Sequence, residues 1–113
     1  MKIKELLPDK KELSLIIKIE EKTNPREVIS KIDNKFHRVC EALVGDETGC
    51  AYLSLWDENM NEFEKGKYYK ITNVYTNLYK HSLRLNIGNK GQIQETNAEF
   101  EINTNNNLSL EEL

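Results

Sequence analysis

Hydrophobic and polar residues alternate along several short stretches of the chain, and each stretch predicts a β-strand. In LSLIIKIEE, residues 13–21, four apolar side chains fall on one face, and in CAYLSLW, residues 50–56, Ala51, Leu53 and Leu55 do the same. Successive side chains of a strand point to opposite sides of a sheet, so one face of each strand is expected to fill a core. The remaining three of the five predicted strands cover 36–45, 67–79 and 82–88, and residues 91–95 are a candidate for a further short strand.

The segments between these strands carry turn and helix signals. Residues 46–49 (DETG) predict a tight turn. Residues 3–7 predict a helical turn, and the polar segment 22–35 predicts a long loop between strands. Residues 57–65 (DENMNEFEK) predict a short helix with Asp57 as its N-cap.

Five strands, a long first loop and a short helix between the third and fourth strands form the pattern of an OB-fold, an all-β five-stranded Greek-key barrel. This folded domain is expected to cover residues 1–96. Residues 97–113 are polar, rich in asparagine and acidic, so they predict a flexible C-terminal tail. The sequence thus predicts one small domain followed by a tail.

The second face of strand 50–56 raises a question, because it carries Tyr52 and the single tryptophan of the chain, Trp56. Alternation places both on the outside of the predicted barrel. Tyr75 and Tyr79 can share this outer surface if a bulge shifts the register of their strand. Aromatic residues also occur in strands for reasons of packing alone, so the pattern has a structural explanation beside the functional one.

Charge is distributed unevenly along the chain, although its net value is only −3. Residues 67–94 contain five Lys and Arg and no acid, whereas residues 95–113 contain five Glu and no base. A local basic field favours a polyanionic partner even when the net charge is negative. A lysine-rich strand edge that resists aggregation is the alternative explanation. The functional explanation is favoured because the aromatic and basic residues lie on the same predicted strands.

Flat rings beside cationic side chains match the chemistry of single-stranded nucleic acids. Unpaired bases stack on aromatic rings, and phosphates pair with lysine and arginine. The residues predicted to stack on bases are Trp56, Tyr75, Tyr79 and Tyr52. The residues predicted to contact phosphates and polar groups are Lys80, Arg84, Asn86, Lys90, Arg38 and Lys35.

Enzymatic and metal-dependent functions find little support in the sequence. No Ser/His/Asp set, phosphate-binding glycine loop or metal-ligand spacing stands out, so we expect no catalytic residue, metal or cofactor. If Gly45 pairs with Ala51, Cys40 and Cys50 lie about 20 Å apart along the strands and stay reduced. No apolar stretch approaches the roughly 20 residues that span a membrane. We therefore expect a cytoplasmic, nucleoid-associated protein.

Several stretches resemble a known family. VGDETG, an alternating strand that ends in LW, EKGK and KITNVYTNLYK…LRLNIG are similar to the small archaeal single-stranded DNA-binding proteins of the crenarchaeal type. The same stretches resemble the B subunit of the eukaryotic sensor-of-ssDNA complex, and the resemblance extends to the OB-folds of replication protein A. It covers about residues 5–96.

This resemblance implies sequence-tolerant binding of single-stranded DNA (ssDNA), without catalysis, that protects the strand in replication, recombination and repair. It assigns base stacking to Trp56, Tyr75 and Tyr79. Relatives often carry tryptophan at the position of Tyr75 and a basic residue at that of Tyr52. Tyr75 is then a smaller platform, and Tyr52 replaces a phosphate contact or adds a ring. Relatives also bind partner proteins through a long C-terminal tail, which is short in this chain. Contacts with replication and repair proteins are therefore expected only through residues 97–113.

Two alternative partners stay open at this point. A surface that depends on stacking and charge also accepts RNA, so a broader binder of single-stranded RNA, or even of duplex DNA, is the first alternative. The second is an OB-fold subunit of a larger complex, which would bury its outer aromatic residues against another protein.

Overall fold

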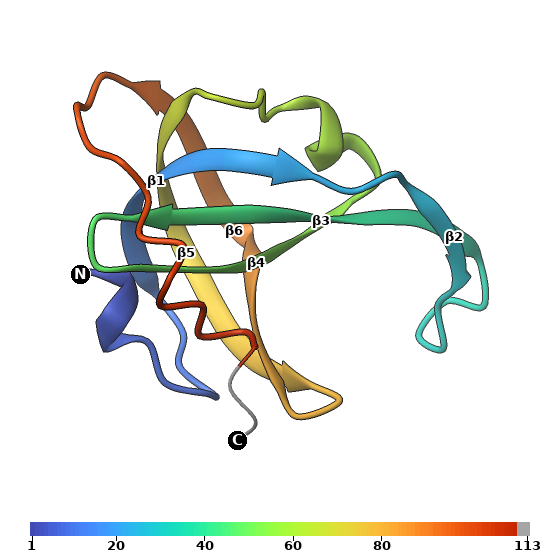
Figure 1. Ribbon diagram of the computed structural model, residues 1–113. Helices are drawn as coiled ribbons and strands as arrows, with labels where there is room; N and C mark the ends of the chain where they lie inside the picture. Colours follow the sequence, from blue (N-terminus) through green and yellow to red (C-terminus); the bar gives the residue numbers. More distant parts are fainter. Residues whose placement is uncertain (111–113) are drawn as a thin grey trace.

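The computed structural model describes residues 1–110, and its regular secondary structure is almost entirely β-strand. No helix among these residues is long and apolar enough to cross a membrane. Two short 3-10 helices and six strands follow one another along the chain (Figure 1): η1 (Ile3–Glu5), β1 (Leu13–Lys22), β2 (Arg26–Ile29), β3 (Phe36–Asp46), β4 (Gly49–Trp56), η2 (Asp57–Asn61), β5 (Tyr68–Tyr79) and β6 (Ser82–Thr96).

The strands form one sheet in the order β1-β5-β6-β4-β3-β2, and β1 also pairs with β3. The five long strands therefore close into a ring. The short strand β2 pairs with the first part of β3, and this hairpin projects from the ring on the right of Figure 1. The sequence predicted five strands. The sixth arises because Arg26–Ile29, inside the predicted loop 22–35, adds to the edge of β3.

The interior of the ring is filled by the apolar face of each strand, as the alternation predicted. Burying a side chain of this size contributes about 1.5–3 kcal/mol, so the apolar faces also fix the register of the strands. Ile3 from η1 and Phe63, which follows η2, pack into the same cluster. The buried strand residues include Leu15, Ile17, Ile19, Ala51, Leu53, Leu55, Ile71, Leu83 and Leu85.

A β-bulge in β5 decides which of its side chains face outward. Before the bulge, odd-numbered residues such as Ile71 point into the core. The register with β6 shifts at Asn73, whose φ of 53° lies in the left-handed region. Because a bulge inserts one extra residue, Val74 takes the next inward position, and Tyr75 and Tyr79 point outward. The bulge predicted for this strand is therefore present.

Three local features differ from the prediction. The helix expected over 57–65 is only a five-residue 3-10 helix, and it lies between β4 and β5 of the six strands. Asp57 is the first residue of η2, whose N-cap is Trp56, and the Asp57 carboxylate accepts a hydrogen bond from the amide of Arg38. The stretches 82–88 and 91–95 belong to one continuous strand, β6.

The tight turn between β3 and β4 sets the positions of the two cysteines. Gly45 pairs with Cys50 rather than with Ala51, so Cys40 lies opposite Leu55. Both cysteines are buried and free, as predicted. Burial raises the pKa of each thiol, because a thiolate would lose its hydration.

The C-terminal segment 97–110 runs back along the outside of the ring (Figure 1). Phe100 packs edge-on against Tyr68, with ring centroids 5.0 Å apart. Further along, the amide and the carbonyl of Cys50 both bond to the backbone of residues 106–108 at 2.9 Å. The segment therefore covers the start of β4 in the way that a short added strand would.

Ser109 fastens the end of this segment between two strands. Its buried hydroxyl accepts a hydrogen bond from the Tyr52 amide of β4 and donates one to the Leu83 carbonyl of β6. The mobility predicted for residues 97–113 stays a prediction, but the described part of this tail has a docked position that the sequence did not indicate. Residues 111–113, the last part of the tail that is expected to bind partner proteins, lie outside the described residues.

Candidate nucleic-acid interface

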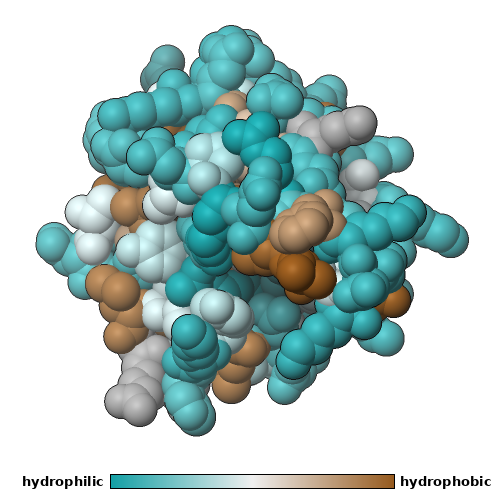
Figure 2. Space-filling view, turned by 90° about the vertical axis from the view of Figure 1, so that its right-hand side faces the viewer, coloured by the Kyte–Doolittle hydropathy of each residue, from teal (hydrophilic) through white to brown (hydrophobic). Residues whose placement is uncertain are grey.

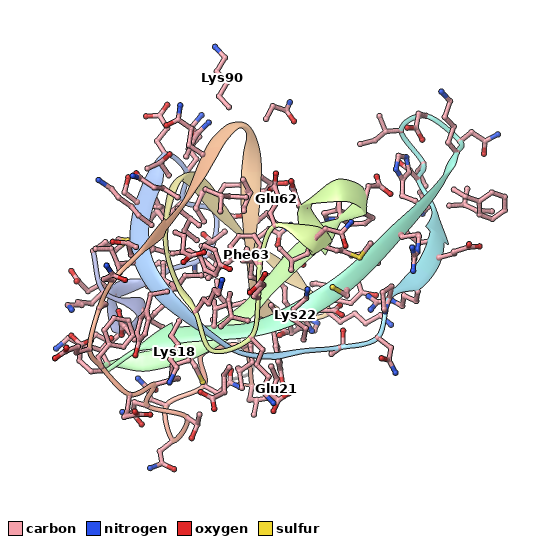
Figure 3. The ribbon with its side chains drawn as sticks, turned by 90° about the horizontal axis from the view of Figure 1, so that it is seen from above. Lys18, Glu21, Lys22, Glu62, Phe63 and Lys90 are labelled. Carbon is pink, nitrogen blue, oxygen red and sulfur yellow. The ribbon has the colours of Figure 1, made fainter. Side chains whose placement is uncertain are left out.

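A groove of about 450 Å³ runs between the β2–β3 hairpin and the outer face of β4, β5 and β6. Figure 3 shows this hairpin reaching beyond the ring. Four residues predicted to bind nucleic acid line the groove, namely Trp56, Tyr79, Arg84 and Asn86. The structure thus brings Trp56 of β4 together with residues of the later β5–β6 hairpin.

Trp56 and Tyr79 provide two half-exposed aromatic rings at this groove. Trp56 is the last residue of β4 and Tyr79 the last residue of β5, and they are 43% and 49% exposed. Alternation with the buried Leu55 places Trp56 on the outer face. Rings held in this way keep part of their flat surface open to a ligand.

Arg84 lies close to two tyrosine rings. Its guanidinium carbon is 5.0 Å from the ring centroid of Tyr52 and 5.5 Å from that of Tyr79. The guanidinium also donates to the carboxylate of Glu41 at 3.4 Å, and the Arg84 side chain is only 17% exposed. Lys80 adds a second cation, 5.4 Å from the Tyr79 ring. Arg84 therefore fixes the two rings relative to each other, and its contact with phosphate stays a prediction.

Asn86 provides a polar group at the base of the groove. It is only 6% exposed and donates a hydrogen bond from Nδ2 to Oδ1 of Asn77 at 3.1 Å. It pairs with Ser54 of β4 on one side and with Tyr75 of β5 on the other. Polar side chains thus lie beneath the rings, where they can meet the edges of stacked bases.

Tyr75 lies beside this groove rather than in it. It is 40% exposed and lines a separate hollow of about 440 Å³ together with Lys10 and Lys11. The loop that carries these lysines is fixed to β5, because the Thr76 amide donates to the Lys10 carbonyl at 2.8 Å and the Lys10 amide donates to Oγ1 of Thr76 at 2.9 Å. Lys10 and Lys11 are therefore basic neighbours of Tyr75 that the sequence analysis missed.

Three other predicted residues lie outside the groove. Arg38 points to the opposite side of β3 from the groove residue Val39 and lines a different cavity with Lys22. Lys35 is exposed in the loop of the β2–β3 hairpin. Lys90 extends from β6 away from that hairpin (Figure 3). These residues can contact nucleic acid only if the bound strand extends beyond the groove.

A histidine flanked by two carboxylates ties the hairpin to the strand end that carries Trp56. His37 Nδ1 lies 2.7 Å from Oδ2 of Asp57, and Nε2 lies 2.9 Å from Oδ2 of Asp33. Hydrogen bonds to Asp57 and then Asp33 raise the pKa of His37 above 6.5. The same contacts lower the pKa of both aspartates below 3.8. The cluster is therefore fully charged at mildly acidic pH.

The stability from His37 is expected to depend on pH. A raised folded-state pKa gives stability that is complete below the unfolded value and is lost as the pH rises through the folded value. Wild type should therefore exceed His37→Gln in melting temperature by more at about pH 5.5 than at about pH 8.5. Thermal unfolding of both proteins at both pH values measures this difference. A difference that does not change with pH would contradict the expected link to His37.

Comparisons with known proteins identify the family. The profile described as "Single-stranded DNA binding protein Ssb-like, OB fold" matches residues 6–95. The chain belongs to this Ssb-like family. The all-β OB-fold predicted from the sequence is thereby confirmed, with six strands in place of five.

Individual relatives support the assignment. The Ssb-like chain is 31% identical over 98 residues to the single-stranded DNA binding protein Ssb of Saccharolobus solfataricus, a match that covers 87% of this chain and 65% of that protein. It therefore spans less than two thirds of that relative's length. The solution structure of a hypothetical protein from Arabidopsis thaliana is similar with a TM-score of 0.81 and 28% identity, covering 99% of this chain and 83% of the other.

A replication protein is also similar in fold. The second OB-fold domain of replication protein A from Methanococcus maripaludis matches the Ssb-like chain with a TM-score of 0.68 and 20% identity, covering 89% and 98% of the two chains. At this identity the similarity supports the fold alone. The crenarchaeal type and the relation to the sensor-of-ssDNA subunit stay predictions.

The comparisons also bear on the class of protein. The family description and the Saccharolobus relative both name a DNA-binding protein and neither names a reaction. Within residues 1–110 of the Ssb-like chain, no group of three or more His, Cys, Asp or Glu residues is placed to hold a metal ion.

Sequence analysis missed one wall of the groove and one residue of its floor. The wall comes from β2 and the loop after it, and its residues are Arg26, Val28, Ile29 and Lys31. The β-branched pair Val28–Ile29 was the available signal, but the polar residues around it favoured a loop. Glu41 lies on the floor, and its alternation with the buried Cys40 and Ala42 already indicated an outward position.

Proposed function

We propose that this protein binds single-stranded DNA in the groove between the β2–β3 hairpin and β4–β6. Bases stack on Trp56 and Tyr79, and the strand continues past Tyr75. Lys80 and Lys31 contact phosphates, with Arg84 behind them. The observation that carries this proposal is the meeting of half-exposed rings, cations and the buried amide of Asn86 in one groove.

The physical argument favours a single strand over a duplex. Base stacking on aromatic side chains contributes about 1–3 kcal/mol per base and needs unpaired bases. Such contacts tolerate any base, because every base has a flat face. In this proposal the closed ring is the Greek-key barrel that the order of the strands in the sequence predicts, and the protein acts by binding, without catalysis.

A biological role follows from this binding mode. A sequence-tolerant binder protects exposed strands during replication, recombination and repair, and it does so beside the chromosome in the cytoplasm. The family assignment and the Saccharolobus relative's name support the binding activity. The cellular role and the location belong to our proposal.

A fluorescence titration tests the proposal directly. Trp56 is the single tryptophan, so quenching by oligo-dT reports on one predicted platform. We expect strong quenching and an affinity that falls with salt, because phosphate contacts release counterions from the strand. Binding without quenching would place the strand away from Trp56, and an absence of binding at low salt would contradict the proposed function.

Competition among oligonucleotides measures which nucleic acid is preferred. DNA single strands, RNA single strands and duplexes of equal length are added to the protein bound to labelled oligo-dT. We expect single-stranded DNA and RNA to compete and duplex DNA to compete weakly, since paired bases cannot stack on the rings. A duplex that competes equally well would contradict base stacking.

A protein partner is the second candidate, and one observation favours it. Figure 2 looks onto the hairpin end of the molecule and shows apolar side chains at the surface, surrounded by hydrophilic ones. The hairpin exposes Ile29, Ile32 and Phe36 to 58%, 97% and 71%. Clustered apolar side chains at a surface are typical of interaction sites. Solution mass with and without oligonucleotide distinguishes self-association through this tip from binding of DNA alone.

A further inference from the structure

Glu41 is an unexpected residue for a groove that takes a polyanion. It lies on β3 at the floor of the groove, and its side chain is 13% exposed. It is the sole acid among the described residues that line this groove. Taken alone, a carboxylate there would repel phosphate. Its contacts indicate a different role.

The Glu41 carboxylate joins two arginines from different strands. Arg26 of β2 donates from Nη1 to Oε2 at 2.7 Å and from Nη2 to Oε1 at 2.8 Å, which is a two-pronged contact. Arg84 of β6 donates from Nη1 to Oε1 at 3.4 Å. Because Arg26 hydrogen-bonds to it, the pKa of Glu41 is lowered, so the carboxylate stays charged at neutral pH. One acid thus links β2, β3 and β6.

Each arginine controls a part of the proposed binding surface. Arg84 lies against the rings of Tyr52 and Tyr79, so its position sets the orientation of the Tyr79 platform. Arg26 begins β2, which has four residues and forms one wall of the groove. A strand this short depends on side-chain contacts to hold its place.

We propose that Glu41 is a positioning residue that holds the Tyr79 platform and the β2 wall in their binding arrangement before the nucleic acid arrives. The inference rests on the proposed function and deepens it. Groups that are already ordered lose less conformational entropy on binding, which favours affinity. The negative charge of Glu41 is offset by its two arginines, so the cost in repulsion is small.

The test compares Glu41→Gln with wild type in oligo-dT titrations over a range of salt concentrations. Glutamine keeps the shape but removes the charge that holds both arginines. We expect affinity to fall about tenfold at high salt, because ordering the groove then opposes binding. We also expect a steeper dependence of log K on log salt, because the freed arginines now meet phosphates. A role confined to stability would not change this slope.

Two results would overturn the inference. Tighter binding of Glu41→Gln at every salt concentration would mean that Glu41 acts only as a repelling charge. Unchanged affinity and slope would mean that it has no role in binding. A wild-type protein that does not bind oligo-dT would instead contradict the proposed function, so the two failures are distinguishable.

A second variant and a matched control complete the test. Arg26→Gln breaks the same contact from the β2 side and is expected to weaken binding at high salt even if Glu41→Gln does not fold. Glu27→Gln is the matched control, because Glu27 is an exposed acid on β2 outside the groove. It should leave the high-salt affinity and the slope unchanged. Loss of affinity in the control as large as in Glu41→Gln would also overturn the inference.

Discussion

Replacing Trp56 by alanine is expected to lower the affinity for oligo-dT by about tenfold or more, since a stacked base contributes about 1–3 kcal/mol. Trp56 offers the largest exposed ring in the groove, and nothing else on the end of β4 replaces it. Tyr79→Ala should cost a similar amount, with an added contribution because the rings of Tyr52 and Tyr79 share Arg84. Fluorescence anisotropy with labelled oligo-dT measures both variants.

Phe36→Ala is the matched control for these substitutions. Phe36 is an exposed aromatic residue on the same hairpin end of the molecule, but it does not line the groove. Its removal should leave the affinity for oligo-dT unchanged. If Phe36→Ala weakened binding as much as Trp56→Ala, the path of the strand would run over the hairpin tip and the groove assignment would be wrong.

The alternation of apolar and polar residues along the chain was sufficient to predict most of the fold. A strand with one apolar face has one stable orientation on a core, so the inward positions of β4 and β6 followed from the residues themselves. The strand β2 was missed for the opposite reason. Arg26–Ile29 has only one half-buried side chain, Val28, and the pairing with β3 decides its conformation more than its own composition does.

The bulge at Asn73 shows how one residue controls the candidate site. Asparagine adopts a left-handed φ more readily than most residues, so the sequence indicated a bulge or bend at Asn73 or Asn77, and the structure has it at Asn73. Which side chains the bulge turns outward depends on the register of β5 with β6, and the local sequence pattern does not specify this register. The same limit applies to Arg84, whose contacts with Tyr52 and Glu41 need the parallel pairing of β4 with β6. Such contacts join residues far apart in the sequence and have no local signal.

Truncating the chain after Thr96 is expected to destabilise the fold substantially. A flexible tail would be removable without loss, but residues 97–110 satisfy backbone groups of β4 and β6 through Cys50, Tyr52 and Leu83. Each such hydrogen bond contributes about 0.5–1.5 kcal/mol, so the set stabilises the protein by about 3 kcal/mol. For a domain of this size we expect the melting temperature to fall by about 10 °C.

Two further proteins separate the causes of this effect. A truncation after Leu110 keeps every contact described for the segment and should melt like the full chain. Ser109→Ala removes only the hydroxyl that bridges β4 and β6, leaving the Tyr52 amide and the Leu83 carbonyl without that partner. Its expected cost is about 1–3 kcal/mol, because buried backbone groups that lose a partner are expensive. If the chain that ends at Thr96 had the same melting temperature as the full protein, residues 97–110 would not stabilise the fold. The flexible tail predicted from composition would then be the better description.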